Sequence, residues 1–225
     1  MGRLIKAYVF DVYGTLFDVY SVKEKCQSIF PHKGEAISQT WRQKQIEYSF
    51  LRQLMGTYRP FHEVTEDALR YAILLHGGEP KESVISELMD AYLHLTPYEE
   101  VKDVLQQLTD KHRAVFSNGS PSMLTPLLQS AEMNELFTSV ITVDENKQYK
   151  PTKAAYQSVV ETLNVAKEEV LFMSSNGWDI TGAKQFGFQT AWINRASLPP
   201  EQLGVKPDFE FHDLTGLLSI EAKSV

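Results

Sequence analysis

The chain has 225 residues, of which 43% are hydrophobic and 23% are charged, a balance typical of a folded globular protein rather than a disordered one. Its formal net charge of −7 argues against nucleic acid or an anionic membrane surface as a partner. The single cysteine, Cys26, excludes an intrachain disulfide and a cysteine-based metal cluster.

The N-terminal segment carries no long apolar run, because Tyr8-Val9-Phe10 is followed directly by Asp11. The sequence pattern therefore indicates neither a signal peptide nor a transmembrane segment. We expect the protein to be cytoplasmic.

Short apolar runs rich in β-forming residues recur along the chain. They predict strands at Ala7–Phe10, Ala114–Phe116, Val140–Val143, Val170–Met173 and Thr190–Ile193. Because segments with helical periodicity separate them, we expect an α/β fold whose Rossmann-like parallel sheet is covered on both faces. Ligands of such folds bind beyond the carboxyl ends of the strands.

One long interval interrupts this alternation, because residues 20–97 show helical patterns but no convincing strand. We expect a helical-bundle cap there, inserted after the first strand of a core formed by residues 1–19 and 98–225. Ser21, with Glu24 three residues later, fits a capping box at the start of the first helix, and Thr65 opens the third. The two crossings, near residues 18–20 and 96–98, are candidate hinges.

A carboxylate follows the first predicted strand directly, in the segment Phe10-Asp11-Val12-Tyr13-Gly14-Thr15-Leu16-Phe17. The strand fixes the backbone and its carboxyl end opens to ligand, so Asp11 is well placed for a nucleophile. The segment resembles the first motif of the haloacid dehalogenase superfamily, whose phosphatases carry Asp-x-Asp-Gly-Thr. Tyr13 replaces the second aspartate, which protonates a leaving alcohol. Since a halide needs no proton, Tyr13 favours carbon–halogen cleavage.

Polar motifs also follow the later strands. They are Ser117-Asn118-Gly119, Tyr149-Lys150-Pro151 and the cluster Ser174-Ser175-Asn176-Gly177-Trp178-Asp179. Each motif alone is a weak signal, since turns and exposed lysines are common. Their joint placement after successive strands is a stronger indication of one site, because the carboxyl ends of parallel strands share an edge.

With these motifs, the chain resembles the L-2-haloacid dehalogenases over nearly its whole length. The shared segments include Phe17-Asp18-Val19, Trp41-Arg42-Gln43-Lys44-Gln45, the cluster 174–179, Gly187-Phe188 and Trp192-Ile193-Asn194-Arg195. The Trp-Arg-Gln-Lys-Gln segment discriminates most, because caps differ widely between branches of the superfamily.

The resemblance implies hydrolysis of short-chain (S)-2-haloacids to (R)-2-hydroxyacids and halide in two steps. Asp11 attacks the halogen-bearing carbon from behind and forms an ester, and water then attacks the carboxyl carbon of that ester. Lys150 would keep Asp11 ionised, since a nearby cation lowers the pKa of a carboxylate. Asp179 would orient or deprotonate the water.

The resemblance also implies a full set of site residues. The catalytic set is Asp11, Thr15, Arg42, Ser117, Lys150, Tyr156, Ser174, Asn176 and Asp179. The set that binds substrate and halide is Val12, Tyr13, Arg42, Gln43, Ile46, Phe61, Ser117, Asn118 and Trp178. In these sets Ser117 and the backbone N–H groups of Val12 and Tyr13 bind the substrate carboxylate. The halide lies among Arg42, Asn118 and Trp178, and an apolar wall is formed by Tyr13, Gln43, Ile46 and Phe61. Ser174 and Asn176 position the water and Asp179, while Thr15 and Tyr156 support Asp11 and Lys150.

We expect no cofactor and no required metal. The six histidines lack ligand spacing, and no glycine-rich nucleotide-binding motif occurs. Asp11 and Asp179 would be the magnesium ligands of a related phosphatase, but the second aspartate is missing and Lys150 already supplies positive charge. Two alternatives remain: a magnesium-dependent small-molecule phosphatase of the same superfamily, or a catalytically silent binding module.

The helical interval carries more large apolar residues than a small substrate needs. Trp41, Tyr48, Phe50, Leu51 and Leu54 all lie on one long predicted helix. We expect a homodimer formed through this helix, which the family resemblance supports.

Overall fold

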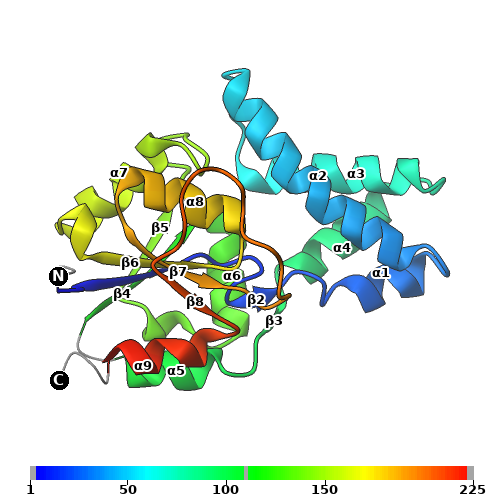
Figure 1. The fold of residues 1–225 in the computed structure, drawn as a ribbon. Helices are drawn as coiled ribbons and strands as arrows, with labels where there is room; N and C mark the ends of the chain where they lie inside the picture. Colours follow the sequence, from blue (N-terminus) through cyan, green and yellow to red (C-terminus); the bar gives the residue numbers. More distant parts are fainter. Residues whose placement is uncertain (1–3, 109–110, 222–225) are drawn as a thin grey trace.

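The computed structural model describes residues 4–108 and 111–221. Its centre is a parallel sheet of six strands in the order β5–β4–β1–β6–β7–β8 (Figure 1). The strands are β1 (Ala7–Phe10), β4 (His112–Ser117), β5 (Ser139–Thr142), β6 (Val170–Ser174), β7 (Gln189–Ile193) and β8 (Phe209–Phe211). The five predicted strands are confirmed, and β8, which is short and partly exposed, is an addition.

Strand β1 lies near the middle of the sheet, paired with β4 on one side and β6 on the other. All four of its residues are buried, as expected of a strand with neighbours at both edges and helices on both faces. Figure 1 shows α7 (Lys153–Leu163) and α8 (Gly177–Phe186) on one face of the sheet, and α5 (Val101–Gln107) and α9 (Leu218–Glu221) on the other. Helix α6 (Pro121–Ser130) and three short 3-10 helices complete this part: η1 (Asn134–Leu136), η2 (Lys167–Glu169) and η3 (Leu214–Leu217).

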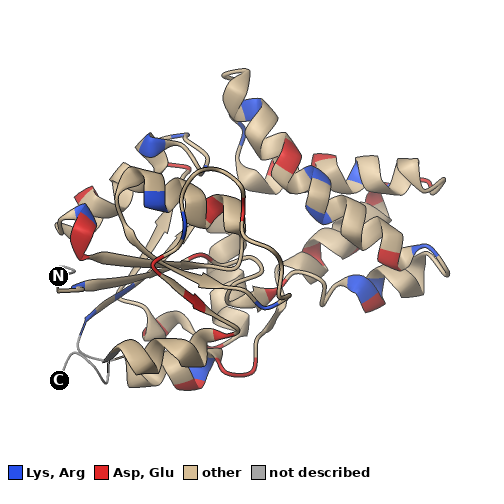
Figure 2. Cartoon of the chain, viewed as in Figure 1, with Lys and Arg blue, Asp and Glu red and all other residues tan. Residues whose placement is uncertain are grey.

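Four consecutive helices form a separate group to one side of the sheet, which we call the helical block (Figure 1). They are α1 (Lys23–Ile29), α2 (Gly34–Leu54), α3 (Phe61–Leu75) and α4 (Glu82–Tyr92). Helices α2 and α3 pack together closely, and their buried faces include Ile37, Trp41, Ala68 and Ala72. Figure 2 shows acidic and basic residues interspersed along these helices, where Arg70 forms ion pairs with Glu66 and Glu82.

Two predicted helix starts in this block are wrong. Helix α1 begins at Lys23 without a side-chain cap, and the Ser21 hydroxyl instead donates to the backbone O of Asp18 and accepts from the N–H of Thr96. Helix α3 begins at Phe61, so Thr65 lies inside it and donates to the backbone O of Phe61. Each hydroxyl donates to a carbonyl of the preceding turn and accepts from a distant group, which is the N–H of Thr96 for Ser21 and Nε2 of Gln45 for Thr65.

The two chain crossings between the sheet and the helical block lie side by side. They form the short antiparallel strands β2 (Phe17–Asp18) and β3 (Thr96–Pro97). The backbone N–H of Tyr98 also donates to the O of Leu16 at 3.0 Å. Within the part of the chain that the structure describes, none of the helices combines the length and the apolar character that a membrane span needs.

Trp41 provides a test of how the helical block is stabilised. Its side chain is 1% exposed, its Nε1 donates to the backbone O of Thr65 at 2.8 Å, and its ring contacts Tyr92. We expect Trp41→Ala to lower the free energy of unfolding by about 3–5 kcal/mol in chemical denaturation, because it leaves a large cavity. Gln43→Ala, at an exposed position of the same helix, serves as the control and should change it by less than about 0.5 kcal/mol. Equal effects of the two substitutions would contradict this packing.

Candidate active site

Three ionised side chains meet at the carboxyl ends of the central strands. Asp11 follows β1, Lys150 lies in the connection between β5 and α7, and Asp179 lies in the first turn of α8 after β6. The Lys150 Nζ donates to Asp11 Oδ1 at 2.9 Å and to Asp179 Oδ2 at 2.5 Å. The Lys150 side chain is 1% exposed, and the carboxylates are 6% and 0% exposed. A buried cation therefore bridges two buried carboxylates.

Three neutral groups hold the other oxygen of Asp11. Its Oδ2 accepts hydrogen bonds from Thr15 Oγ1 at 2.9 Å, Ser174 Oγ at 3.1 Å and Asn176 Nδ2 at 2.8 Å. Thr15 reaches back because Gly14 adopts a φ of +87°, a left-handed conformation that favours glycine. The hydroxyl of Thr15 also accepts from the N–H of Ser175, so its proton points to Asp11.

Asp179 is held by Tyr156 and not by the predicted Ser174 and Asn176, whose side chains donate to Asp11 instead. The hydroxyl of Tyr156 donates to Asp179 Oδ1 at 2.7 Å, whereas we expected Tyr156 to support Lys150. This prediction is corrected: Tyr156 orients Lys150 only through the carboxylate that both groups bind. The predicted hydrogen bond from Thr15 to Asp11 is present.

The charges explain the direction of each pKa shift. Burial by itself raises the pKa of Asp11, but Lys150, Arg42 and Thr15 together hold it below its ordinary value. Burial by itself lowers the pKa of Lys150, but the charges of Asp11 and Asp179 outweigh this effect and raise the pKa above its ordinary value. The ammonium therefore stays charged. Burial raises the pKa of Asp179 to about 6; Lys150 opposes this rise and the charge of Asp11 adds to it. The two carboxylates are therefore unequal, and Asp11 keeps its charge to a lower pH than Asp179 does.

The helical block supplies a second cation. Arg42 on α2 donates through Nη2 to the backbone O of Tyr13 at 3.2 Å and to Asn176 Oδ1 at 3.3 Å. Its Nη1 donates to Gln45 Oε1 at 2.8 Å. Arg42 thus connects the helical block to the loop after β1 and to the start of α8.

A small cavity of about 20 Å³ lies between these groups. It is lined by Asp11, Tyr13, Arg42, Ile46, Ser49, Phe61, Ser117, Asn118, Lys150, Asn176 and Trp178. Thr15, Ser174, Tyr156 and Asp179 form the layer behind it through the hydrogen bonds given above. The cavity joins a carboxylate and two cations to an aromatic and aliphatic wall, which suits a small anion with a short apolar chain.

The remaining predicted residues occupy three different positions. Ser117 Oγ accepts from the N–H of Gly119 at 3.0 Å, and Asn118 Oδ1 accepts from the N–H of Lys150 at 2.9 Å. The side chain of Val12 is buried beneath the cavity, and its carbonyl accepts from the N–H groups that follow. Gln43 is exposed and does not line the cavity, so its predicted place in the apolar wall is wrong. The helical turn directs Gln45, rather than Gln43, inward.

Sequence reasoning missed several groups that support this site. Gln45 and Tyr92 are buried behind Arg42, and Ser49 lines the cavity one turn further along α2. Arg195, in the loop after β7, donates to the backbone O of Thr15 at 2.9 Å and to Glu100 at 2.6 Å. Arg195 could have been predicted from the sequence, because it lies in the segment Trp192-Ile193-Asn194-Arg195 that carries the family resemblance. Gln45 could have been found as a polar residue one helical turn from Trp41, on the buried face.

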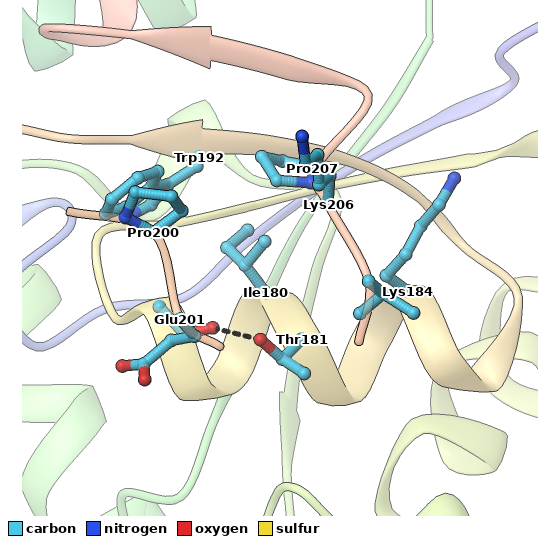
Figure 3. A pocket seen from close by; sticks show the side chains of 10 residues that line it. Ile180, Thr181, Lys184, Trp192, Pro200, Glu201, Lys206 and Pro207 are labelled. Carbon is cyan, nitrogen blue, oxygen red and sulfur yellow. Dashed lines mark hydrogen bonds between the residues drawn. The ribbon is translucent and has the colours of Figure 1, made fainter. Parts of the chain in front are cut away.

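A second small cavity, of about 10 Å³, lies between α8, Trp192 of β7 and the loop that follows β7 (Figure 3). It is lined by Ile180, Thr181 and Lys184 of that helix and by Pro200, Glu201, Lys206 and Pro207 of the loop that covers it. None of the predicted catalytic side chains lines it, and Lys184 is paired with Asp208. We interpret it as a packing gap under the loop.

A metal ion is not favoured by the arrangement of the donors. Among residues 4–108 and 111–221, no group of three or more His, Cys, Asp or Glu side chains is placed to hold one. The position between Asp11 and Asp179, where a cation would bind two carboxylates, is taken by the Lys150 ammonium. Lys150 therefore supplies the positive charge that these carboxylates require.

Comparison with known proteins identifies the class. The model of the haloacid dehalogenase-like hydrolase family matches residues 5–187, and the chain belongs to this family. It is 48% identical over 194 residues to an (S)-2-haloacid dehalogenase of Xanthobacter autotrophicus, covering 86% of this chain and 77% of the relative. It is 42% identical over 218 residues to the (S)-2-haloacid dehalogenase of Pseudomonas sp. strain YL, covering 96% of this chain and 94% of the relative.

A solved structure closely matches the whole fold. It is the L-2-haloacid dehalogenase from Xanthobacter autotrophicus with chloropropionic acid covalently bound. It is 40% identical in sequence, with a TM-score of 0.92, covering 99% of this chain and 100% of that chain. The likeness therefore includes the helical block as well as the sheet.

Tyr156 allows the electrostatics of the site to be tested. Its hydroxyl stabilises the charged form of Asp179, so Tyr156→Phe should raise the pKa of Asp179 above its value of about 6. The carboxyl band of Asp179 in an infrared pH titration, assigned with an Asp179→Asn control, measures it. A pKa that stays the same or falls would contradict the proposed hydrogen bond.

Proposed function

We propose that this protein hydrolyses short-chain (S)-2-haloacids to (R)-2-hydroxyacids and halide. The observation that carries the proposal is the Lys150 ammonium between Asp11 and Asp179, combined with Tyr13 in place of the phosphatases' acid. This arrangement provides an ionised nucleophile and a second carboxylate, and it lacks the second aspartate of the first motif, which protonates the leaving alcohol in the phosphatases. The chain is accordingly a hydrolase that acts on carbon–halide bonds.

In the first step the Asp11 carboxylate attacks C2 of the substrate from the side opposite the halogen, so the configuration inverts. Ser117 and the N–H groups of Val12 and Tyr13 bind the substrate carboxylate. Arg42, Asn118 and Trp178 surround the departing halide, and the Arg42 guanidinium stabilises its developing charge. Ile46, Phe61 and Tyr13 exclude bulk water from the reacting atoms.

In the second step water attacks the carboxyl carbon of the Asp11 ester. Asp179 is not esterified, and its raised pKa makes it a better proton acceptor than an ordinary aspartate. Ser174 and Asn176, which donate to Asp11 in the resting site, position the water and stabilise the oxyanion. As the tetrahedral intermediate collapses, Asp179 returns the proton that it took from water to the leaving C2 oxygen, which releases the 2-hydroxyacid and restores the Asp11 carboxylate.

A phosphatase reaction is disfavoured by the state of Tyr13. Its ring is 3% exposed, and burial raises the pKa of its hydroxyl well above the ordinary value. Such a phenol is a weak acid and a poor substitute for the aspartate that protonates a leaving alcohol. A silent binding module is disfavoured because the nucleophile, the cation and the second carboxylate are all present.

We also propose that the helical block acts as a cap on the core, with residues 20–97 as the cap and residues 1–19 and 98–225 as the core. Arg42, Ile46 and Phe61 of the block line the cavity opposite Asp11, so closure of the block completes the site. The paired crossings β2 and β3 are the hinge about which the block would move. The expected cytoplasmic location remains a prediction, which fractionation of expressing cells would test.

The decisive experiment is chloride release from racemic 2-chloropropionate in excess EDTA. We expect release to stop when about half of the substrate is consumed and to leave D-lactate, because one enantiomer reacts with inversion and no metal is required. Asp11→Asn should abolish release. Magnesium-dependent hydrolysis of p-nitrophenyl phosphate without any chloride release would instead identify a phosphatase.

The partner proposed for this chain is a second copy of itself. Of the five residues on which we based this expectation, Trp41 is buried within the block, Phe50 packs against Trp178, and Tyr48 is partly buried and packs against Tyr71. The other two, Leu51 and Leu54, are exposed by 42% and 84%. Tyr71 of α3 adds a further exposed ring, and a patch of this kind is typical of an interface.

Light scattering at micromolar concentration tests the dimer. We expect a dimeric mass for the wild type and a monomeric mass for Leu54→Glu, because a charge buried at an apolar interface is costly. Leu198→Glu, at an exposed position in a loop of the core, is the matched control and should remain dimeric. A monomeric wild type would refute the proposal.

A further inference from the structure

Gln45 is a fully buried amide directly behind Arg42. Its Oε1 accepts from Arg42 Nη1 at 2.8 Å and from the hydroxyl of Tyr92 at 3.1 Å, and its Nε2 donates to Thr65 Oγ1 at 2.8 Å. The side chain is 0% exposed, and Tyr92 and Thr65 are also buried. Burying an amide costs free energy unless its polar atoms are hydrogen-bonded, and here three hydrogen bonds satisfy them. These hydrogen bonds hold the Gln45 side chain in one position.

The direction of each hydrogen bond follows from its partners. The Thr65 hydroxyl donates to the backbone O of Phe61 at 2.7 Å, and a carbonyl only accepts. Thr65 Oγ1 must then accept from Gln45, so the NH₂ group of Gln45 faces Thr65. The carbonyl of Gln45 therefore faces Arg42, and the hydroxyl of Tyr92 reinforces that orientation.

The amide holds Arg42 without neutralising it. Within the described part of the chain Arg42 forms no ion pair, and its Nη2 remains directed at the cavity edge formed by Tyr13 O and Asn176 Oδ1. A glutamate at position 45 has a side chain of the same length as glutamine and could also accept from Arg42, but its negative charge would offset the charge of the guanidinium. A neutral acceptor fixes one end of the guanidinium and leaves its charge available.

We propose that Gln45 is a positioning residue for halide departure, which holds Arg42 as an uncompensated cation at the leaving-group side of the cavity. The inference rests on the proposed dehalogenase function and extends it to a residue without contact to the substrate. It predicts a defect confined to carbon–halogen cleavage. That defect should be larger for chloride than for bromide, because chloride is the poorer leaving group and depends more on stabilisation.

The experiment compares kcat for 2-chloropropionate and 2-bromopropionate in the full-length enzyme. In Gln45→Met, which keeps the side-chain length, we expect kcat for the chloride substrate to fall about tenfold to hundredfold, as for loss of one hydrogen bond to a charged group. The bromide-to-chloride ratio of kcat should rise. Ester hydrolysis, followed after rapid mixing, should keep the wild-type rate. Gln45→Glu should raise the same ratio, since its carboxylate offsets the charge of Arg42.

Ser38→Ala is the matched control, because Ser38 is also buried on α2 but its Oγ has no hydrogen-bond partner. Ser38→Ala should leave kcat for both substrates, and the bromide-to-chloride ratio of kcat, unchanged. Thermal unfolding shows whether each variant is folded. If Gln45→Met does not fold, Gln45→Glu still tests the proposal. The inference would be overturned by a folded Gln45 variant in which kcat falls equally for the chloride and bromide substrates, or in which neither kcat falls. A wild type that releases no halide would instead overturn the proposed function itself.

Discussion

The site depends on one buried cation. Two carboxylates that share a buried site cannot both remain ionised without compensation, and the Lys150 ammonium bridges them at 2.9 and 2.5 Å. Removing one member of such a buried set leaves an uncompensated charge and typically costs about 3–5 kcal/mol. The single charge of Lys150 does not balance two carboxylates, so the charge of Arg42 and a set of neutral donors stabilise them further. The neutral donors are Thr15, Ser174, Asn176 and Tyr156. The same donors then fix the geometry of the nucleophile.

Asp11 and Arg42 come from different parts of the chain, so their alignment depends on contacts between those parts. On one side Gln53 of α2 accepts from the N–H of Tyr149 at 2.8 Å, directly before Lys150. On another side Ser120, at the start of α6, accepts from the N–H of His62 at 3.0 Å. The Tyr149 hydroxyl also donates to the backbone O of Arg59 at 2.6 Å. The helical block is thus held against the core around the cavity, which keeps Arg42 opposite Asp11.

The sequence predicted the sheet and the charged residues well, because buried strands leave a clear apolar pattern and their carboxyl ends must meet. The predictions failed where a polar side chain forms a hydrogen bond with a residue that is distant in the sequence. Ser21 and Thr65 resemble helix caps locally, yet their hydroxyls bind Thr96 and Gln45. Gln43 and Gln45 are equivalent by composition, and only the helical phase set by tertiary packing directs Gln45 inward. Strand β8 was missed because three partly exposed residues carry almost no periodic signal.

The central claim is that Asp11 becomes esterified and that water attacks its carboxyl carbon. Turnover of 2-chloropropionate in water labelled with oxygen-18 tests this most directly, by mass spectrometry of the product and of the peptide that contains Asp11. Under single-turnover conditions the account predicts unlabelled lactate and label incorporated into Asp11. Labelled lactate in the first turnover, with an unlabelled Asp11, would show that water attacks C2 directly and would contradict it.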